Sequence, residues 1–318
     1  MMLYQRCPDG TWETARTLPQ PRLRQGVISY RGLRLELGRP RRRLEAPIGA
    51  VALWLGFGRR VRVTRSAGPS AWFDCCLAGL QTRASLGEHD GRLEGVEVML
   101  APWAAFALFG IPMHELSERA VDPHEVMGRR IDALVDALAT AAGWATRFAL
   151  LDAALERWTA EGPVVSAPVV RAWSKLARTG GALPIARLAA DVGWGERQLE
   201  NRFRDQIGLR PKAAARVVRL QRAMKLLDAG RPPAQVAGVC GFYDQAHFSG
   251  EFKAMTGRTP SEFTSERNGM DSMKAGRPMV DRLSGAVTSV LLSEAPGARI
   301  HECGFMSADS SKTGALLS

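Results

Sequence analysis

Short runs of alternating apolar and polar residues occupy the first hundred positions of the chain. Leu33, Leu35 and Leu37 alternate with charged residues, and the same period of two recurs in two later runs. A period of two places successive side chains on opposite faces of a β-strand. The apolar run 49–58 is continuous and is typical of a buried strand. The pattern therefore predicts a region rich in β-strands over residues 1–100.

The period changes to that of a helix from about residue 124. Apolar residues then recur at spacings of three and four, which places them on one helical face, as in Phe148, Leu151, Leu155 and Trp158. Glu161-Gly162-Pro163 interrupts this pattern with two residues that disfavour helix. We interpret that tripeptide as the end of the first domain.

These patterns predict an α+β protein made of two domains and a tail. We expect residues 1–162 to form a β-rich domain with helices, which serves in sensing, effector binding or dimerisation. Residues 163–267 are expected to form an all-α domain. Residues 268–318 are rich in Gly, Ser and Met. We expect them to form a poorly ordered tail, with a short ordered piece around 287–292.

The basic charge is unevenly distributed along the chain. The formal net charge is +11. Lys and Arg exceed Asp and Glu by eight in residues 168–268, whereas acidic residues exceed basic ones by five in residues 61–167. Clustered cations are what neutralisation of DNA phosphates requires. No apolar run is long enough to span a membrane, and the five cysteines form no CxxC pair. We therefore expect a cytoplasmic protein without a membrane partner.

An internal repeat is the most informative feature of the basic region. Two segments that begin at Leu188 and Val236 match at an offset of 48 residues, and the segments that follow match at an offset of 49. Each copy places a glycine between a short helical segment and a second, longer one. A glycine can adopt the left-handed conformation that ends the first helix, and this is typical of a helix-turn-helix. An amphipathic helical hairpin alone would not explain why glycine, aromatic, apolar and proline positions recur in order.

Each copy has an outward stripe of polar side chains opposite its apolar stripe. Leu199 and Phe203 mark the buried side of the first recognition helix, and Phe248 and Phe252 mark that of the second. Asp244 is expected to be the N-cap of the second helix. The opposite side chains are of types that reach base edges or phosphates. The predicted DNA-binding residues are Arg197, Gln198, Glu200, Asn201 and Arg204 in the first copy, and Gln245, His247, Ser249 and Lys253 in the second. A helical segment of about 18 residues, roughly 27 Å long, joins the two copies.

The segment from Gly241 to Ser249, continued by Glu251-Phe252-Lys253 and by Gly257 to Phe263, closely resembles the signature of AraC/XylS-type transcription regulators. The resemblance covers about 100 residues. It implies two helix-turn-helix units that bind double-stranded DNA as one module, and a contact with RNA polymerase. Members of the family usually carry arginine at the position of Gly250. The front of the chain is similar to the sensor region of some actinobacterial relatives, through Glu88-His89-Asp90-Gly91 and Gly110-Ile111-Pro112-Met113.

Residues that could support other chemistry are few. Some relatives with this DNA-binding unit carry a zinc-cysteine repair site, which needs four cysteines in two spaced pairs; residues 1–160 contain only Cys7, Cys75 and Cys76. His114, Glu115 and Glu118 are too few to form a metal site, so we expect no metal and no cofactor. Trp54, Trp72 and Trp103 line a ligand pocket or pack in the core, the latter being the more common role of tryptophan.

Three classes of function remain at this point. We expect an effector-responsive, sequence-specific DNA-binding transcription regulator, and an activator rather than a repressor. It would have an unknown small-molecule effector and form a homodimer. The alternative is a DNA-repair protein or other enzyme that uses the helix-turn-helix unit for targeting. The third class is a sensor or protein-binding module whose DNA contact is vestigial. The retained Arg197, Asn201 and Arg204 argue against it.

Overall fold

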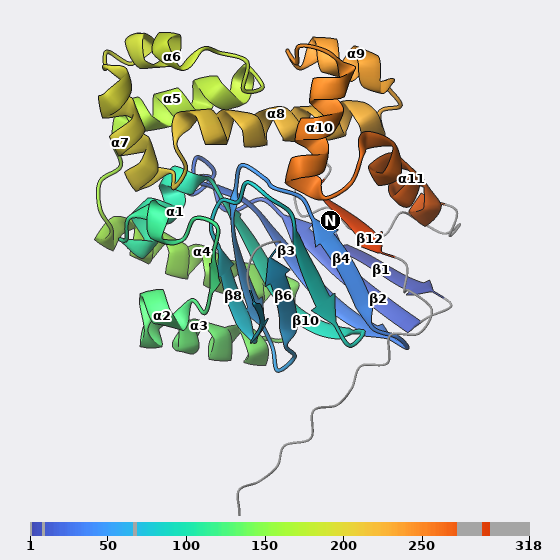
Figure 1. Cartoon of the computed structure of the whole chain (residues 1–318). Coiled ribbons are helices and arrows are strands. Elements are labelled where there is room, and N and C mark those ends of the chain that lie inside the picture. Colours follow the sequence, from blue (N-terminus) through green and yellow to red (C-terminus); the bar gives the residue numbers. More distant parts are fainter. Residues whose placement is uncertain (1, 8–9, 66–68, 272–287, 293–318) are drawn as a thin grey trace, which may run out of the picture.

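The computed structural model describes residues 2–7, 10–65, 69–271 and 288–292, and it stacks a helical region on a β-sandwich (Figure 1). Every strand pair is antiparallel. The larger sheet has, in spatial order, β1 (Met2–Cys7), β2 (Gly10–Thr17), β3 (Val27–Leu37), β10 (Arg92–Leu100), β5 (Val51–Gly56), β8 (Cys75–Ala78) and β11 (Ala120–Val121). The smaller sheet has β12 (Ser289–Leu292), β4 (Arg41–Glu45), β9 (Ser85–His89), β6 (Val61–Arg65) and β7 (Ser70–Phe73).

The alternating pattern of the sequence accounts for the packing between the two sheets. Leu33, Trp54 and Leu93 of the larger sheet form a buried cluster with Val61 and Val63 of the smaller one. Their sequence neighbours point to the opposite faces because the side chains of a strand alternate. The predicted α+β fold with a β-rich first region is therefore confirmed.

Helices cover the other face of the larger sheet. They are α1 (Pro102–Phe109), the 3-10 turn η1 (Met113–Glu115), α2 (His124–Met127), α3 (Arg129–Thr140) and α4 (Trp144–Glu161). A second hydrophobic cluster joins α3 and α4 to this sheet through residues such as Phe148, Leu151 and Val98. Helix α1 was not predicted, because its residues are apolar on all sides and give no helical periodicity.

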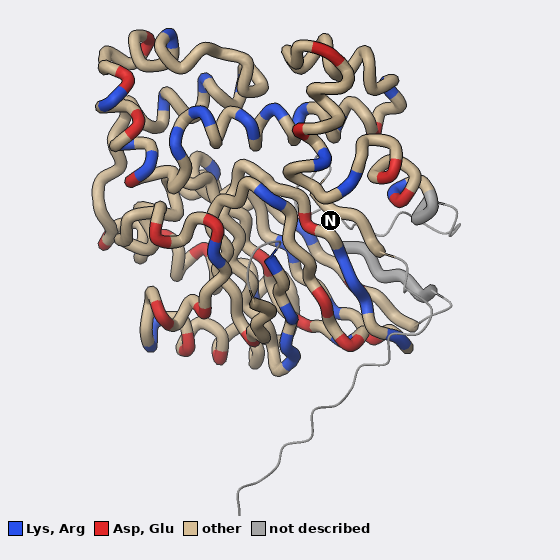
Figure 2. Tube along the Cα trace, viewed as in Figure 1, with Lys and Arg blue, Asp and Glu red and all other residues tan. Residues whose placement is uncertain are grey.

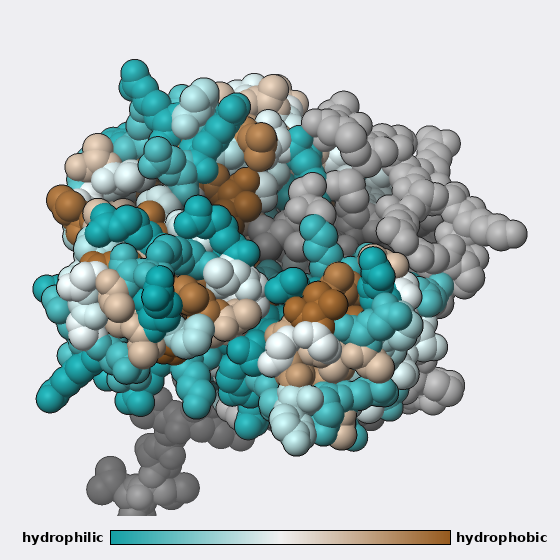
Figure 3. Space-filling view, turned by 90° about the horizontal axis from the view of Figure 1, so that it is seen from above, coloured by the Kyte–Doolittle hydropathy of each residue, from teal (hydrophilic) through white to brown (hydrophobic). Residues whose placement is uncertain are grey.

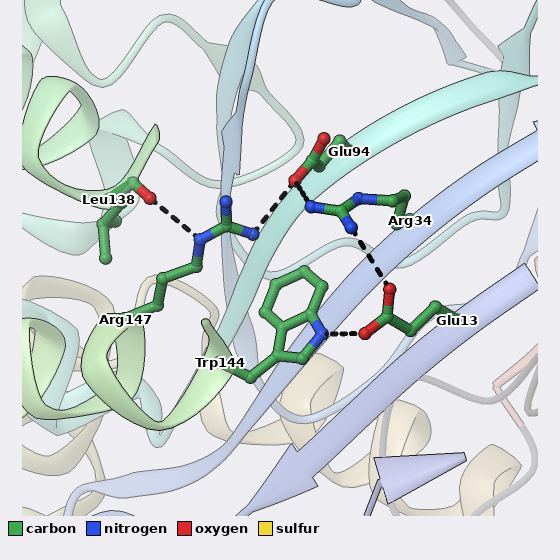
Figure 4. A network of polar contacts seen from close by, with 6 residues as sticks. All are labelled: Glu13, Arg34, Glu94, Leu138, Trp144 and Arg147. Atoms are coloured by element: carbon green, nitrogen blue, oxygen red, sulfur yellow. Dashed lines mark hydrogen bonds and ion pairs between the residues drawn. The ribbon is translucent and has the colours of Figure 1, made fainter. Parts of the chain in front are cut away.

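A polar network fixes α4 on the sheet (Figure 4). The Arg147 guanidinium is 3.0 Å from Glu94, donates from Nε to the Leu138 carbonyl oxygen at 2.9 Å, and lies 4.7 Å from the centre of the Trp144 ring. Arg34 approaches the same Glu94 oxygen at 2.6 Å. The Arg147 side chain is almost fully buried, so these partners compensate the cost of removing its charge from water.

Seven helices form the upper region of Figure 1: α5 (Ala167–Arg178), α6 (Ile185–Asp191), α7 (Glu196–Gln206), α8 (Pro211–Asp228), α9 (Pro233–Val239), α10 (Gln245–Thr256) and α11 (Pro260–Asp271). Helix α8 is the 18-residue helix predicted between the two repeats. Its buried residues form one hydrophobic cluster with α5–α7 on one side and α9–α11 on the other.

The helical region and the sandwich share this cluster. Leu44 and Ala84 of the smaller sheet and its loops belong to it, and so does Val290 of β12. The Gly49 amide also donates to Oε1 of Gln221 in α8 at 3.0 Å. The domain limits 1–162 and 163–267 stay a prediction, since apolar packing continues across them.

The expected tail at 268–318 falls largely outside the described residues. Within it, the structure describes the end of α11 and the strand β12. Arg267 of α11 links this helix to both α8 and β12. It pairs with Asp228 of α8 at 2.8 Å and donates to the Ser289 carbonyl oxygen of β12 at 2.9 Å. Among the residues that the structure describes, no helix has both the length and the apolar composition to cross a membrane.

Candidate DNA-binding interface

The first helix-turn-helix consists of α6 and α7. Gly193, at φ +78°, takes the left-handed conformation between them, as the repeat predicted. Lys175 of α5 donates to Asp191 at the end of α6 at 2.5 Å and holds the pKa of that carboxyl below its usual value. Phe203 is fully buried and its ring centre lies 6.2 Å from that of Trp173 in α5. These contacts fix α7 with one face in the core.

The outward face of α7 carries the predicted residues of the first unit. Arg197, Gln198, Asn201 and Arg204 are exposed, whereas Glu200 is half-buried at the edge of that face. Arg202 is also exposed, although it was not predicted as a contact. Arg197, Asn201 and Arg204 lie within 60° of one another on a helical wheel, so one flank of duplex DNA can meet all three.

The second helix-turn-helix consists of α9 and α10, and its helix start is better defined. The Asp244 carboxylate accepts from the His247 amide at 2.7 Å, which is the predicted N-cap. The rings of Phe242, Phe248, Phe252 and Phe263 follow one another with centres 5.0, 5.7 and 5.4 Å apart and connect the turn to α11. This row of rings holds the buried face of α10.

The predicted residues of α10 are less uniform in position. Gln245, His247 and Lys253 are exposed, and Ser249 is half-buried. His247 is occupied within its own unit, since its Nε2 lies 3.6 Å from Glu251 and its Nδ1 accepts from the Tyr243 amide at 3.4 Å. Tyr243 is 92% exposed in the turn before α10, a position that sequence reasoning missed.

The nine predicted residues thus form two sets, one on α7 and one on α10, with α8 between them. Figure 2 shows many Lys and Arg residues along α7 and α8. Seen from above, the two units form separate lobes with mainly hydrophilic side chains between them (Figure 3). No observation tests whether the nine residues bind DNA, so their role stays a prediction.

Lys212, Arg216 and Arg219 of α8 were also missed. They lie on one side of α8 at spacings of four and three residues, and they border a groove between the two units. Their spacing was visible in the sequence. Only the packing of α10 against α8, through an Arg216–Glu251 ion pair of 2.6 Å, shows which side they face.

The cysteines, the possible metal ligands and the three tryptophans singled out in the sequence do not form a second site among the described residues. Cys76 and Cys240 are buried, and burial raises the pKa of the Cys75 thiol to about 11, which disfavours the reactive thiolate. In the described part of the chain, no three His, Cys, Asp or Glu side chains are arranged to hold a metal ion. Trp54 lies between the sheets, Trp103 packs on the helical cluster and Trp72 is exposed on β7, so the three tryptophans line no common pocket.

Comparisons with known proteins agree with the geometry of the helical region. A family model described as a helix-turn-helix domain matches residues 171–266. The probable thc operon regulatory protein of Rhodococcus erythropolis is 32% identical over 84 residues, which are 25% of this chain and 25% of that protein. The chain therefore matches about a quarter of the length of this curated relative.

Several solved structures match the chain at low overall similarity. A transcriptional regulator with an AraC-type DNA-binding domain from Chromobacterium violaceum is 29% identical, covers 31% of this chain and 90% of its own, and has a TM-score of 0.30. ToxT from Vibrio cholerae is 13% identical, covers 71% of this chain and 96% of its own, and has a TM-score of 0.42. The matched segment and the paired units confirm the resemblance inferred from the sequence: residues 171–266 form an AraC-type helix-turn-helix domain.

Proposed function

We propose that this chain is a sequence-specific transcription regulator that inserts α7 and α10 into successive major grooves on one face of duplex DNA. The observation that carries the proposal is the pair of helix-turn-helix units joined by α8. An 18-residue helix spans roughly 27 Å, and the major groove returns to the same face of DNA every ~34 Å. The exposed polar faces of α7 and α10 supply the groups for base and phosphate contact.

The sandwich is proposed to sense a small-molecule effector and to transmit binding to the DNA-binding units. Its support is the shared hydrophobic cluster and the Gly49–Gln221 hydrogen bond, which tie the sandwich to α8. A ligand that changes the position of the sandwich would thereby change the relation between the two units, which is a coupling free energy between two sites. Activation through RNA polymerase and a homodimeric state are further parts of the proposal, and they follow from the family resemblance.

Selection from random duplexes with the full chain tests the core of this proposal. We expect recovery of a motif with two half-sites about 10 base pairs apart, and footprints over two major grooves on one face. Binding is expected to weaken steeply as salt rises, because phosphate contacts release counterions. A full chain that folds but neither enriches a motif nor binds duplex DNA at low salt would refute the proposal.

The enzyme alternative predicts different results from the same protein. An enzyme that uses the DNA unit for targeting would turn over a substrate or hold stoichiometric metal. A thermal-shift screen of metabolites, followed by DNA titration with and without each hit, separates the two readings. An effector should shift both the melting temperature and the DNA affinity.

A further inference from the structure

A groove of about 810 Å³ separates the two helix-turn-helix units. One wall is the segment 181–185, which leads into α6 of the first unit and includes its first residue, Ile185. The other wall is the side of α10 that carries His247, Gly250 and Glu251. Lys212, Arg216 and Arg219 of α8 border the groove between these walls. The groove is therefore lined by residues of both units and of the helix that connects them.

We propose that this groove binds the sugar-phosphate backbone of the DNA segment that runs between the two major grooves. The inference rests on the proposed function, and it adds a third contact region to the two recognition helices. The chemical class of the ligand is a phosphodiester chain, so the contact contributes affinity and register but reads no sequence.

The charge of the groove fits that ligand. Lys212 and Arg219 are seven positions apart on α8, so the row with Arg216 between them extends roughly 10 Å along the helix axis. Each strand of duplex DNA carries one phosphate per ~3.4 Å of helix axis. A row of three cations on this length scale can meet two or three consecutive phosphates.

Two of the three cations are already held in place. Arg219 donates to the Gly181 carbonyl oxygen at 3.1 Å and lies 5.5 Å from the centre of the Phe242 ring. Arg216 is fixed by Glu251. Lys212 is exposed and has no ion-pair or hydrogen-bond partner among the residues that the structure describes. Preorganised arginines lose little side-chain entropy on binding, and the free lysine can follow the phosphates.

The position of Gly250 shows which way the groove opens. Gly250 lies opposite Phe248 and Phe252 on α10, so it faces away from the core and toward any DNA that α10 enters. The same residue lines the groove. DNA that meets the outward face of α10 at Gly250 would therefore lie beside the groove.

Glu251 allows the direction of a change in DNA affinity to be predicted. Its carboxylate is the one acidic group among the residues that line the groove, and it sits between Arg216 and His247. A negative charge there opposes a phosphate and partly neutralises Arg216. Glu251→Gln retains an oxygen that can accept from Arg216, so it removes the charge while preserving the contact.

The test measures affinity against salt concentration for full-length variants on the duplex recovered by selection. Lys212→Gln should bind several-fold more weakly and lower the magnitude of the salt slope by about one, the value of one phosphate contact. Glu251→Gln should bind several-fold more tightly. Lys225→Gln, on the last turn of α8, and Asp228→Asn, which loses a carboxylate paired with Arg267 outside the groove, are matched controls and should bind like wild type.

The outcomes separate this inference from the proposed function. Absence of wild-type DNA binding refutes the proposed function. Wild-type binding with an unchanged salt slope in Lys212→Gln, or unchanged or weaker binding by a folded Glu251→Gln, overturns the groove assignment alone. Circular dichroism and thermal unfolding of each variant establish that it is folded.

Discussion

The first recognition helix presents long polar side chains along its outward face, whereas the second has Ala246 and Gly250 where long side chains would reach DNA. The second helix has the better N-terminal cap. Asp244 caps α10 with its side chain, whereas α7 begins after Gly195, which has no side chain to cap it. The unit with more groups for reading bases is thus the one whose helix start is less well fixed. We infer that the first unit contributes more of the sequence preference and that the second contributes more to orientation.

The C-terminal ends of both helices nevertheless lie against segments from the first region of the chain. Just after α7, the Gly208 backbone lies so close to Met113 of η1 and to Ser117 that a Cβ on it would overlap them. At the end of α10, the Met255 carbonyl oxygen accepts from the Ala84 amide at 2.7 Å. Both C-terminal ends are covered by the first region, so both N-terminal halves, which carry most of the predicted DNA-binding residues, remain available.

The largest expected effect is on the folding of the first unit. Phe203→Ala removes a fully buried ring and should lower the free energy of unfolding by about 3–5 kcal/mol, measured by chemical denaturation. Arg202→Ala is the matched control, because its side chain is exposed on the same helix, and it should change stability by less than about 0.5 kcal/mol. Equal losses from both variants would contradict the packing described for α7.

The next effect tests the asymmetry in base recognition. Arg197→Ala or Asn201→Ala should cost about 1–3 kcal/mol of binding to the selected duplex and relax the base preference in one half-site. Ser249→Ala should cost less, because Ser249 is short and half-buried. Binding-site selection with each variant provides the measurement. An equal or larger loss from Ser249→Ala would reverse the assignment of the two units.

Much of this architecture could be predicted from the sequence, because periodicity and turn chemistry are local. The period of two marked the strands around Leu33, and the repeated glycine, aromatic and proline positions marked both helix-turn-helix units. The N-cap at Asp244 was also confirmed. The resemblance to a known family also showed that Gly250 stands where members usually carry arginine.

The features that escaped prediction depend on contacts between distant segments. β12 pairs with β4 across more than 240 residues, and no local pattern specifies such a partner. The groove requires Arg216 to meet Glu251, 35 residues away. Glu200 and Ser249 were placed on the outward faces by the helical period, but both are half-buried.

A smaller effect is expected at Gly250, where the second recognition helix departs from the family pattern. A Cβ at this position would meet no heavy atom within 4 Å, so the protein itself has space for a side chain. Gly250→Arg should fold, gain up to about 1 kcal/mol of helix stability, raise DNA affinity and steepen the salt slope by about one. Titration at several salt concentrations measures this change. Weaker binding with an intact fold would show that the DNA backbone needs the space that glycine leaves at this position.

The smallest effects compare the two helix starts directly. Asp244→Ala removes the cap of α10 and should cost about 1 kcal/mol of stability, whereas Gly195→Ser adds a hydroxyl acceptor at the start of α7 and should gain a few tenths of a kcal/mol. Gly195 has extended backbone, at φ −74° and ψ 158°, and a Cβ there would meet nothing within 4 Å, so serine fits without strain. Denaturation midpoints of the two variants and of the double variant measure both changes. Because the caps belong to separate helices, the two changes in the free energy of unfolding should add in the double variant. If Gly195→Ser lowers stability, α7 needs a glycine at its start for a reason other than capping.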